Sequence, residues 1–291
     1  MNVHRESKGE NIGQNYAWMR GQPIPGSPAG AQTAAPSRNK QQTKKPAQKP
    51  AQKPPAQQKP AAPAKPGTVA DGKAQNAVDG KDLAGKFKFD NKSTDYSIEQ
   101  VIKAQGFDGK PTITNNLADF TSACKASDFI AKRGVGASDQ RTLAAYDKNL
   151  KSGDFYVKCS GGSVHGYGMY AASVQANGRN AKYGIKDAED TAQSYASWRS
   201  NVSKIYTMTL DKSAKIGNED SLKRQMRSDT EFQKVCNAST MNRRYTQDVG
   251  VYAAYKGYDA YVAGSGRSSS SGSSSDYTVI LNRSKVILYE P

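Results

Sequence analysis

Residues 165–173 form the segment of this chain that is best suited to chemistry. They run HGYGMYAAS, and AKYG follows at 181–184. Two glycines on either side of one residue permit a tight backbone turn, and Tyr170 stands at the mouth of that turn. His165 is expected to be a turn residue rather than a general base, because no neighbour in the sequence would orient its ring.

Conventional catalytic sets are absent from the rest of the sequence. The two histidines, His4 and His165, leave too little material for a Ser-His-Asp triad, a Cys-His pair or a histidine-rich metal site. No GxGxxG motif opens a helix after a strand and no GxxxxGK[ST] motif occurs, so neither a Rossmann dinucleotide site nor a P-loop is expected. The three cysteines lack CxxC spacing, which argues against a zinc site and for a reducing compartment.

The elements that position the 165–173 segment follow from hydrophobic periodicity, capping residues and glycine breaks. Helices and strands alternate without a regular βαβ order, which favours an α+β domain over a doubly wound sheet. The expected helices cover 97–105, 117–125, 142–150, 219–228, 230–237 and 246–256, and the expected strands cover 129–133, 155–159, 204–210, 258–263, 277–282 and 285–289. Asn116 is the expected cap of the second helix, Ser97 and Gln100 are expected to form a capping box, and Gly106 ends the first helix.

The first 85 residues have the composition of a disordered tail. Eleven of the 13 prolines precede residue 67, and residues 1–80 hold 12 basic but only 4 acidic side chains. With so little to bury, the segment cannot offset its ordering entropy. Residues 38–66 are either a solvated linker or a basic arm that holds nucleic acid or an anionic surface through salt-sensitive phosphate contacts. We therefore predict a disordered tail over 1–85 and a folded domain over 86–291.

Membrane insertion and secretion are not expected. No stretch approaches the ~20 apolar residues of a membrane span. The first eight residues, MNVHRESK, lack the apolar core of a secretory signal. The expected location is the cytoplasm.

The glycine-tyrosine segment resembles a known family when it is taken with two further segments. HGYGMYAAS and AKYG are similar to the GxGxY segment of ADP-ribosyltransferases, in the branch that includes poly(ADP-ribose) polymerases and diphtheria-type toxins. KRGV at 132–135 and the segment 275–286 stand in the order that this family requires. The resemblance covers roughly residues 93–291 and extends to transferase-like domains of phage-encoded proteins. It implies an α+β fold with a pair of packed sheets and peripheral helices.

The resemblance implies that NAD is bound by five residues. Arg133, followed by Gly134, matches the position that holds the phosphate or ribose oxygens of NAD, which the rigid fork of a guanidinium suits. Gly168 belongs to the turn that precedes the first ring. Tyr170 and Tyr183 match the two aromatic residues that sandwich the nicotinamide ring, whose positive charge a π face attracts.

The resemblance also implies a catalytic carboxylate and an acceptor loop. Asp276 stands where such enzymes have a glutamate, which bonds a ribose hydroxyl and stabilises the oxocarbenium-like centre as nicotinamide leaves. An aspartate is one methylene shorter. The serine-rich loop 264–275 matches the loop that presents the acceptor.

Three function classes follow from these features, and the last of them makes the basic tail primary, with nucleic acid as its partner. The first is an enzyme, an NAD-dependent mono-ADP-ribosyltransferase that moves ADP-ribose to an unidentified protein acceptor and releases nicotinamide. The second is a structural, virion-associated phage protein that keeps the transferase fold with a degraded site. A phage-encoded protein would act in the host cytoplasm or in the virion.

Overall fold

A computed structural model describes residues 72–152, 165–177, 181–197, 200–263 and 276–291, and all of them belong to one compact unit. The predictions for the tail up to residue 71, for the strand over 155–159 and for the acceptor loop over 264–275 lie outside these described residues. Among the helices of the described ranges, none combines the length and the apolar character that crossing a membrane requires.

The folded part begins before residue 86, which corrects the predicted domain boundary. The Ala74 amide donates to Asp211 Oδ2 at 2.8 Å, and the Val78 amide donates to Ser284 Oγ at 3.0 Å. Leu83 is buried in an apolar cluster of the domain. Composition did not reveal this segment, because side chains far along the chain hold its backbone in place.

In the described part of the chain, eight strands form one mixed sheet in the order β1-β8-β4-β2-β3-β7-β6-β5. The outer pairs β1–β8 and β5–β6 are parallel, and the remaining neighbours are antiparallel. The strands are β1 (Thr112–Thr114), β2 (Ile130–Ala137), β3 (Met169–Val174), β4 (Val202–Leu210), β5 (Ile216–Asn218), β6 (Ala260–Ala263), β7 (Asp276–Ile280) and β8 (Val286–Tyr289).

The ladder between β2 and β3 is the short one at the centre of the sheet. β2 pairs with β4 over seven residue pairs and β3 pairs with β7 over five, whereas β2 and β3 share three, ending at Lys132 and Ala172. The strands therefore belong to one hydrogen-bonded sheet with a short central ladder. This finding corrects the expected pair of separate packed sheets, while the predicted mixture of helices and strands is confirmed.

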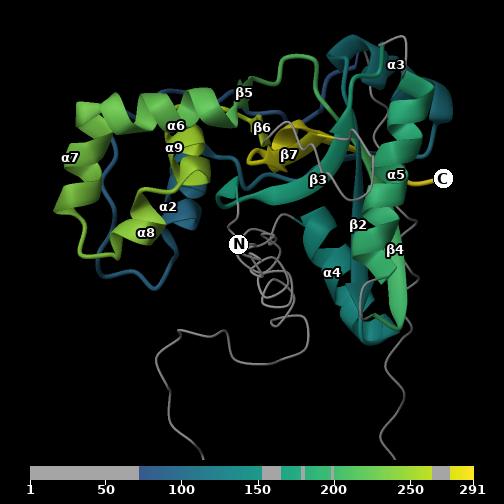
Figure 1. Cartoon of the computed structure of the whole chain (residues 1–291), viewed down its shortest axis with the longest axis horizontal. Helices are drawn as coiled ribbons and strands as arrows, with labels where there is room; N and C mark the ends of the chain where they lie inside the picture. The colour runs from purple at the N-terminus through teal and green to yellow at the C-terminus, as the bar shows by residue number, and fades with distance from the viewer. Residues whose placement is uncertain (1–71, 153–164, 178–180, 198–199, 264–275) are drawn as a thin grey trace, which may run out of the picture. The chain divides into compact units, whose positions relative to one another are not determined.

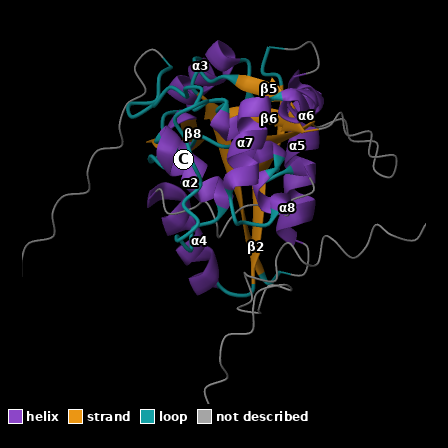
Figure 2. Cartoon of the chain, turned by 90° about the vertical axis from the view of Figure 1, so that its left-hand side faces the viewer, coloured by secondary structure: helices purple, strands orange, loops and turns teal. Residues whose placement is uncertain are grey.

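Helices surround the sheet in several places (Figure 1). α5 packs against β2, β3 and β4, α4 lies near β2 and β4, and α3 packs against β1, β4 and β8. A second group, formed by α2, α6, α7, α8 and α9, gathers beside β5 and β6 and faces the viewer in Figure 2. The helices are α2 (Ser97–Gln105), α3 (Leu117–Ser127), α4 (Gln140–Ser152), α5 (Ala181–Ser197), α6 (Glu219–Ser228), α7 (Thr230–Ala238), α8 (Arg243–Thr246) and α9 (Val249–Tyr255), with a 3-10 turn, η3 (Arg283–Lys285), before β8.

Glycines in β2 allow α5 to lie directly on the sheet. A Cβ atom on Gly134 would lie 1.7 Å from the Ala192 carbonyl oxygen, and one on Gly136 would lie 2.2 Å from the Ala196 carbonyl oxygen. Only glycine leaves room for so close an approach. β2 therefore continues through both glycines to Ala137, beyond the strand end predicted at Gly134.

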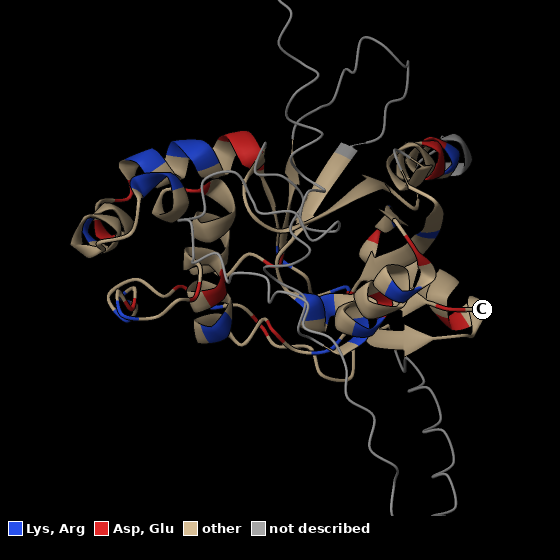
Figure 3. Ribbon diagram, turned by 90° about the horizontal axis from the view of Figure 1, so that it is seen from below, with Lys and Arg blue, Asp and Glu red and all other residues tan. Residues whose placement is uncertain are grey.

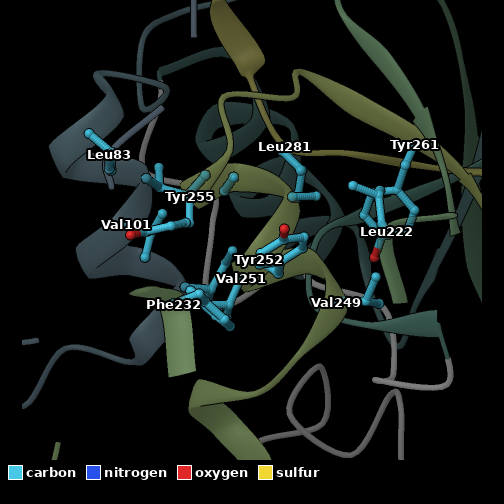
Figure 4. Packing of buried hydrophobic residues seen from close by; sticks show 14 of the residues in the cluster. Leu83, Val101, Leu222, Phe232, Val249, Val251, Tyr252, Tyr255, Tyr261 and Leu281 are labelled. Carbon is cyan, nitrogen blue, oxygen red and sulfur yellow. The ribbon is translucent and has the colours of Figure 1, made fainter. Parts of the chain in front are cut away.

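The core of the second helix group surrounds α9, which is buried along its whole length. The Phe232 ring of α7 lies 4.9 Å from the Tyr252 ring and 5.0 Å from the Tyr255 ring, measured between centroids (Figure 4). Aromatic pairs at such distances and tilts are favourable beyond the area that they bury. This packing fixes α9, whose residues in turn contact the backbone before β3.

Local signals explain several helix boundaries. The Asn116 side chain accepts two amides of the first turn of α3, and Gly106 ends α2 with a φ of 73°, both as predicted. The capping box is wrong: Ser97 is already the first residue of α2, and the Gln100 side chain binds the backbone of Asp90 instead. The predicted helix over 246–256 is divided between α8 and α9, and α5, β1, β3 and β5 were not predicted.

Candidate functional site

Three strands that are neighbours in the sheet carry four of the six predicted site residues (Figure 1). Arg133 lies on β2, Tyr170 lies on β3, and Asp276 is the first residue of β7. The register sets Tyr170 opposite Val279 and Asp276 opposite Ser173. Segments that are far apart in the sequence therefore meet at the centre of the sheet.

Arg133 occupies the point at which β2 and β3 separate. It follows the last residue of their ladder, and its Nη1 donates to the carbonyl oxygen of Tyr170. Its Nε donates to Tyr146 Oη of α4 at 2.6 Å. The guanidinium is thereby held in a defined direction between α4 and β3, as recognition of a phosphate by a guanidinium fork requires.

Gly134 and Gly168 both have packing roles. Gly134 admits the backbone of α5, as described above. Gly168 has a φ of 152°, and a Cβ atom there would lie 2.2 Å from Val279 Cγ1 of β7. Close packing therefore explains both glycines, and their contact with NAD stays a prediction.

The Tyr170 hydroxyl holds the turn that precedes β3. It donates to the Gly166 carbonyl oxygen at 2.6 Å and accepts from the His165 amide at 2.9 Å. Burial raises the pKa of Tyr170 well above its ordinary value, so the phenol stays protonated at neutral pH. The predicted ligand-stacking residue is thus also the residue that closes the turn.

Two other elements fix the same turn from outside. Tyr261 Oη of β6 donates to the His165 carbonyl oxygen at 2.6 Å. Asp248, which caps α9, accepts the Tyr167 amide at 2.9 Å in addition to two amides of its own helix. The backbone of residues 165–167 is therefore held by β3, β6 and α9 together. This fixes the backbone from which the His165 side chain projects.

The ring of His165 has a buried carboxylate as its partner. His165 Nδ1 lies 3.0 Å from Glu219 Oε2, and Glu219 Oε1 lies 2.5 Å from Lys223 Nζ. The Glu219 side chain is only 5% exposed, whereas that of His165 is 30% exposed. The expectation that nothing orients this ring is therefore wrong, because Glu219 belongs to another element and no local pattern in the sequence links the two residues.

Glu219 is the first residue of α6, and the acidic first turn of this helix is followed by basic residues, as the colours of Figure 3 show. The free amides at a helix N-terminus stabilise a nearby negative charge. Lys223, one turn further along, supplies a positive partner for the second carboxylate oxygen.

Tyrosine rings surround His165 on the side of β3 and β7. The centroids of the Tyr170 and Tyr277 rings each lie 6.3 Å from that of His165, and the Tyr277 ring is inclined to it by only 22°. Tyr195 of α5 donates its hydroxyl to Tyr277 Oη at 3.3 Å. The sequence could have identified Tyr277 as a site residue, because it directly follows Asp276. No pattern in the sequence indicates Tyr195.

Two of the predicted residues are placed by their backbones alone. Tyr183 lies in the first turn of α5, and Asp276 begins β7 beside the centre of the sheet. Their side chains lie outside the described part of the structure. The nicotinamide sandwich of Tyr170 with Tyr183, and the reach of the Asp276 carboxylate, therefore stay predictions.

Metal and thiol chemistry find little support in the described ranges. Within them, no group of three or more His, Cys, Asp and Glu side chains is arranged to hold a metal ion. Cys124 and Cys236 are buried, and burial raises the pKa of each thiol to about 11. Neither would supply a thiolate near neutral pH. Cys159 lies outside the described residues.

Comparison with known proteins does not assign this chain to a family. No protein-family model, no curated protein and no solved structure matches it. A function must therefore be argued from the geometry and chemistry of the site itself.

Proposed function

We propose that this protein is an NAD-dependent mono-ADP-ribosyltransferase, which moves ADP-ribose from NAD to a protein acceptor and releases nicotinamide. One observation carries the proposal: the three segments that resemble the transferase motifs lie on β2, β3 and β7, which are neighbours in the sheet. Arg133 binds the backbone of Tyr170 at the point where the first two of these strands separate. The segments have no local reason to meet, so their meeting supports a shared site.

Each residue has a distinct role in the proposed reaction. Arg133 would hold the phosphate or ribose oxygens of NAD with the donors of its fixed guanidinium. Tyr170, with Tyr183, would stack on the cationic nicotinamide ring. Asp276 would bind a ribose hydroxyl and stabilise the positive charge that develops on the sugar as nicotinamide leaves. Loop 264–275, which directly precedes Asp276, would contact the acceptor.

The test is release of nicotinamide from NAD by the full chain and by two variants of Asp276. Asp276→Asn keeps the shape of the side chain but removes the charge, and we expect a loss of about 100-fold or more in rate. Asp276→Glu adds one methylene and moves the carboxylate about 1 Å further, and we expect the rate to be kept or raised. Asp190→Asn, an exposed residue of α5, is the matched control and should leave the rate unchanged.

A second function is favoured by the aspartate that stands in place of a glutamate. This residue would suit a virion-associated phage protein that keeps the transferase fold with a degraded site. Absence of nicotinamide release from both the wild-type chain and Asp276→Glu would replace the enzymatic proposal with this structural one. Nucleic-acid binding by residues 38–66 is a separate hypothesis, which the salt dependence of binding before and after removal of the tail would test.

A further inference from the structure

The contact with Glu219 determines which nitrogen of His165 carries a hydrogen. When the Glu219 carboxylate is ionised it can only accept hydrogen bonds, and the 3.0 Å contact between Oε2 and Nδ1 then places the hydrogen of the neutral ring on Nδ1. In the neutral ring, Nε2 then keeps its lone pair and can accept a proton. This is the arrangement by which a buried carboxylate orients a histidine base in hydrolases.

The Nε2 atom is available for such a role. It makes no hydrogen bond to any of the described residues, and the side chain of His165 is 30% exposed. Its ring is next to Tyr170, the predicted stacking residue, and to Tyr277, the neighbour of Asp276. A base here would stand beside the site proposed for the nicotinamide-ribose bond.

Several titratable groups surround the His165 ring. Their charges contribute to the pH dependence of nicotinamide release. Glu219 binds the ring directly, and Lys223 shares the carboxylate. Four tyrosines and one aspartate contact the ring, its neighbours or its backbone: Tyr170 on β3, Tyr277 on β7, Tyr195 on α5, Tyr261 on β6 and Asp248 before α9.

We propose that His165 is the general base for ADP-ribose transfer, that Glu219 is its positioning residue, and that the attacking group of the acceptor is a hydroxyl. This inference rests on the proposed function. A hydroxyl loses its proton as it attacks, so an imidazole placed beside it lowers the barrier. A thiolate needs no base, so it would not explain an oriented imidazole.

Transfer of ADP-ribose needs only NAD and the acceptor hydroxyl as reactants. The bond between the ribose carbon and the nicotinamide nitrogen breaks, and its electron pair leaves with neutral nicotinamide. The hydroxyl oxygen forms the new bond to that carbon, and its proton passes to Nε2 of His165. The imidazolium that results is stabilised by Glu219 until the proton is lost to solvent.

The test compares the pH dependence of nicotinamide release by the full chain, His165→Ala and Glu219→Gln, with NAD in water and with methanol as an added hydroxyl acceptor. We expect His165→Ala to lower the rate by about 100-fold. Added imidazole should restore activity, and more basic imidazoles should restore more of it. Asp276→Asn, which lacks a different group, should not respond to imidazole.

Glu219→Gln separates a positioning role from a purely structural one. A purely structural contact would leave the kinetics of nicotinamide release by a folded variant unchanged. An amide can donate as well as accept, so Glu219→Gln no longer fixes the hydrogen on Nδ1, and we expect a lower kcat with an unchanged KM for NAD. Thermal unfolding of each variant reports whether the fold is kept. In the methanol experiment, ADP-ribose as product identifies water as the hydroxyl source, and its methyl derivative identifies an alcohol.

The possible failures of the two proposals can be told apart. A wild-type chain that releases no nicotinamide at any pH overturns the proposed function and this inference together. A wild-type chain that is active, with His165→Ala equally active, overturns this inference alone. If His165→Ala does not fold, an unchanged kcat in Glu219→Gln has the same consequence.

Discussion

Replacement of Tyr170 by phenylalanine removes a single oxygen atom that closes the turn before β3. The hydroxyl donates to the Gly166 carbonyl oxygen at 2.6 Å and accepts from the His165 amide at 2.9 Å. The ring itself, which packs against the cluster around α9, is kept. Tyr170→Phe therefore isolates the contribution of these two hydrogen bonds.

The expected cost follows from the burial of the two partners. A buried polar group that loses its partner costs about 1–3 kcal/mol. Gly166 is buried, so about 2 kcal/mol is expected for its carbonyl, whereas His165 is partly exposed, so water can satisfy part of its amide at a cost of about 1 kcal/mol. Together they predict a decrease of about 3 kcal/mol in the free energy of unfolding.

Urea unfolding followed by far-UV circular dichroism measures this difference. Tyr258→Phe is the matched control, because the Tyr258 hydroxyl makes no hydrogen bond to the residues that the structure describes, and its cost should stay within about 0.5 kcal/mol. Equal midpoints and slopes for Tyr170→Phe and Tyr258→Phe would refute the conclusion that the Tyr170 hydroxyl holds the turn.

Two further predictions concern packing and pH. Gly134→Ala would set a methyl group 1.7 Å from the Ala192 carbonyl oxygen, so α5 must move, and thermal unfolding should show a loss of about 3 kcal/mol. Burial alone would raise the pKa of Asp211, but hydrogen bonds from Ser213 and from the Ala74 amide hold that pKa below its ordinary value of 3.8. The charge of Asp211 therefore stabilises the fold above about pH 4, and this contribution is lost as the pH falls through the lowered pKa. Unfolding at pH 6 and at pH 2 should show Asp211→Asn less stable than wild type at pH 6 and nearly equal to it at pH 2.

Features that depend on neighbouring residues could be predicted from the sequence. Asn116 caps α3 and Gly106 ends α2, because a cap or a left-handed turn acts within one helical turn. The alternating pattern of β4 and the buried segments of β6, β7 and β8 also lie where they were expected. α5 was missed because its buried face is made of alanines, at 188, 192 and 196, and their four-residue spacing is the signal that could have revealed it.

The sequence by itself determined most of the helices, several of the strands, the mixed class and the order of the three segments that resemble a transferase. Only the tertiary structure decided that these segments share a junction at Arg133, that Gly134 serves the approach of α5, and that the fold begins before residue 86. It also decided that Glu219 orients His165. The reason is physical: capping and periodicity act between residues close in the chain, whereas a hydrogen bond between side chains of distant elements or a backbone contact depends on the packing that brings those elements together.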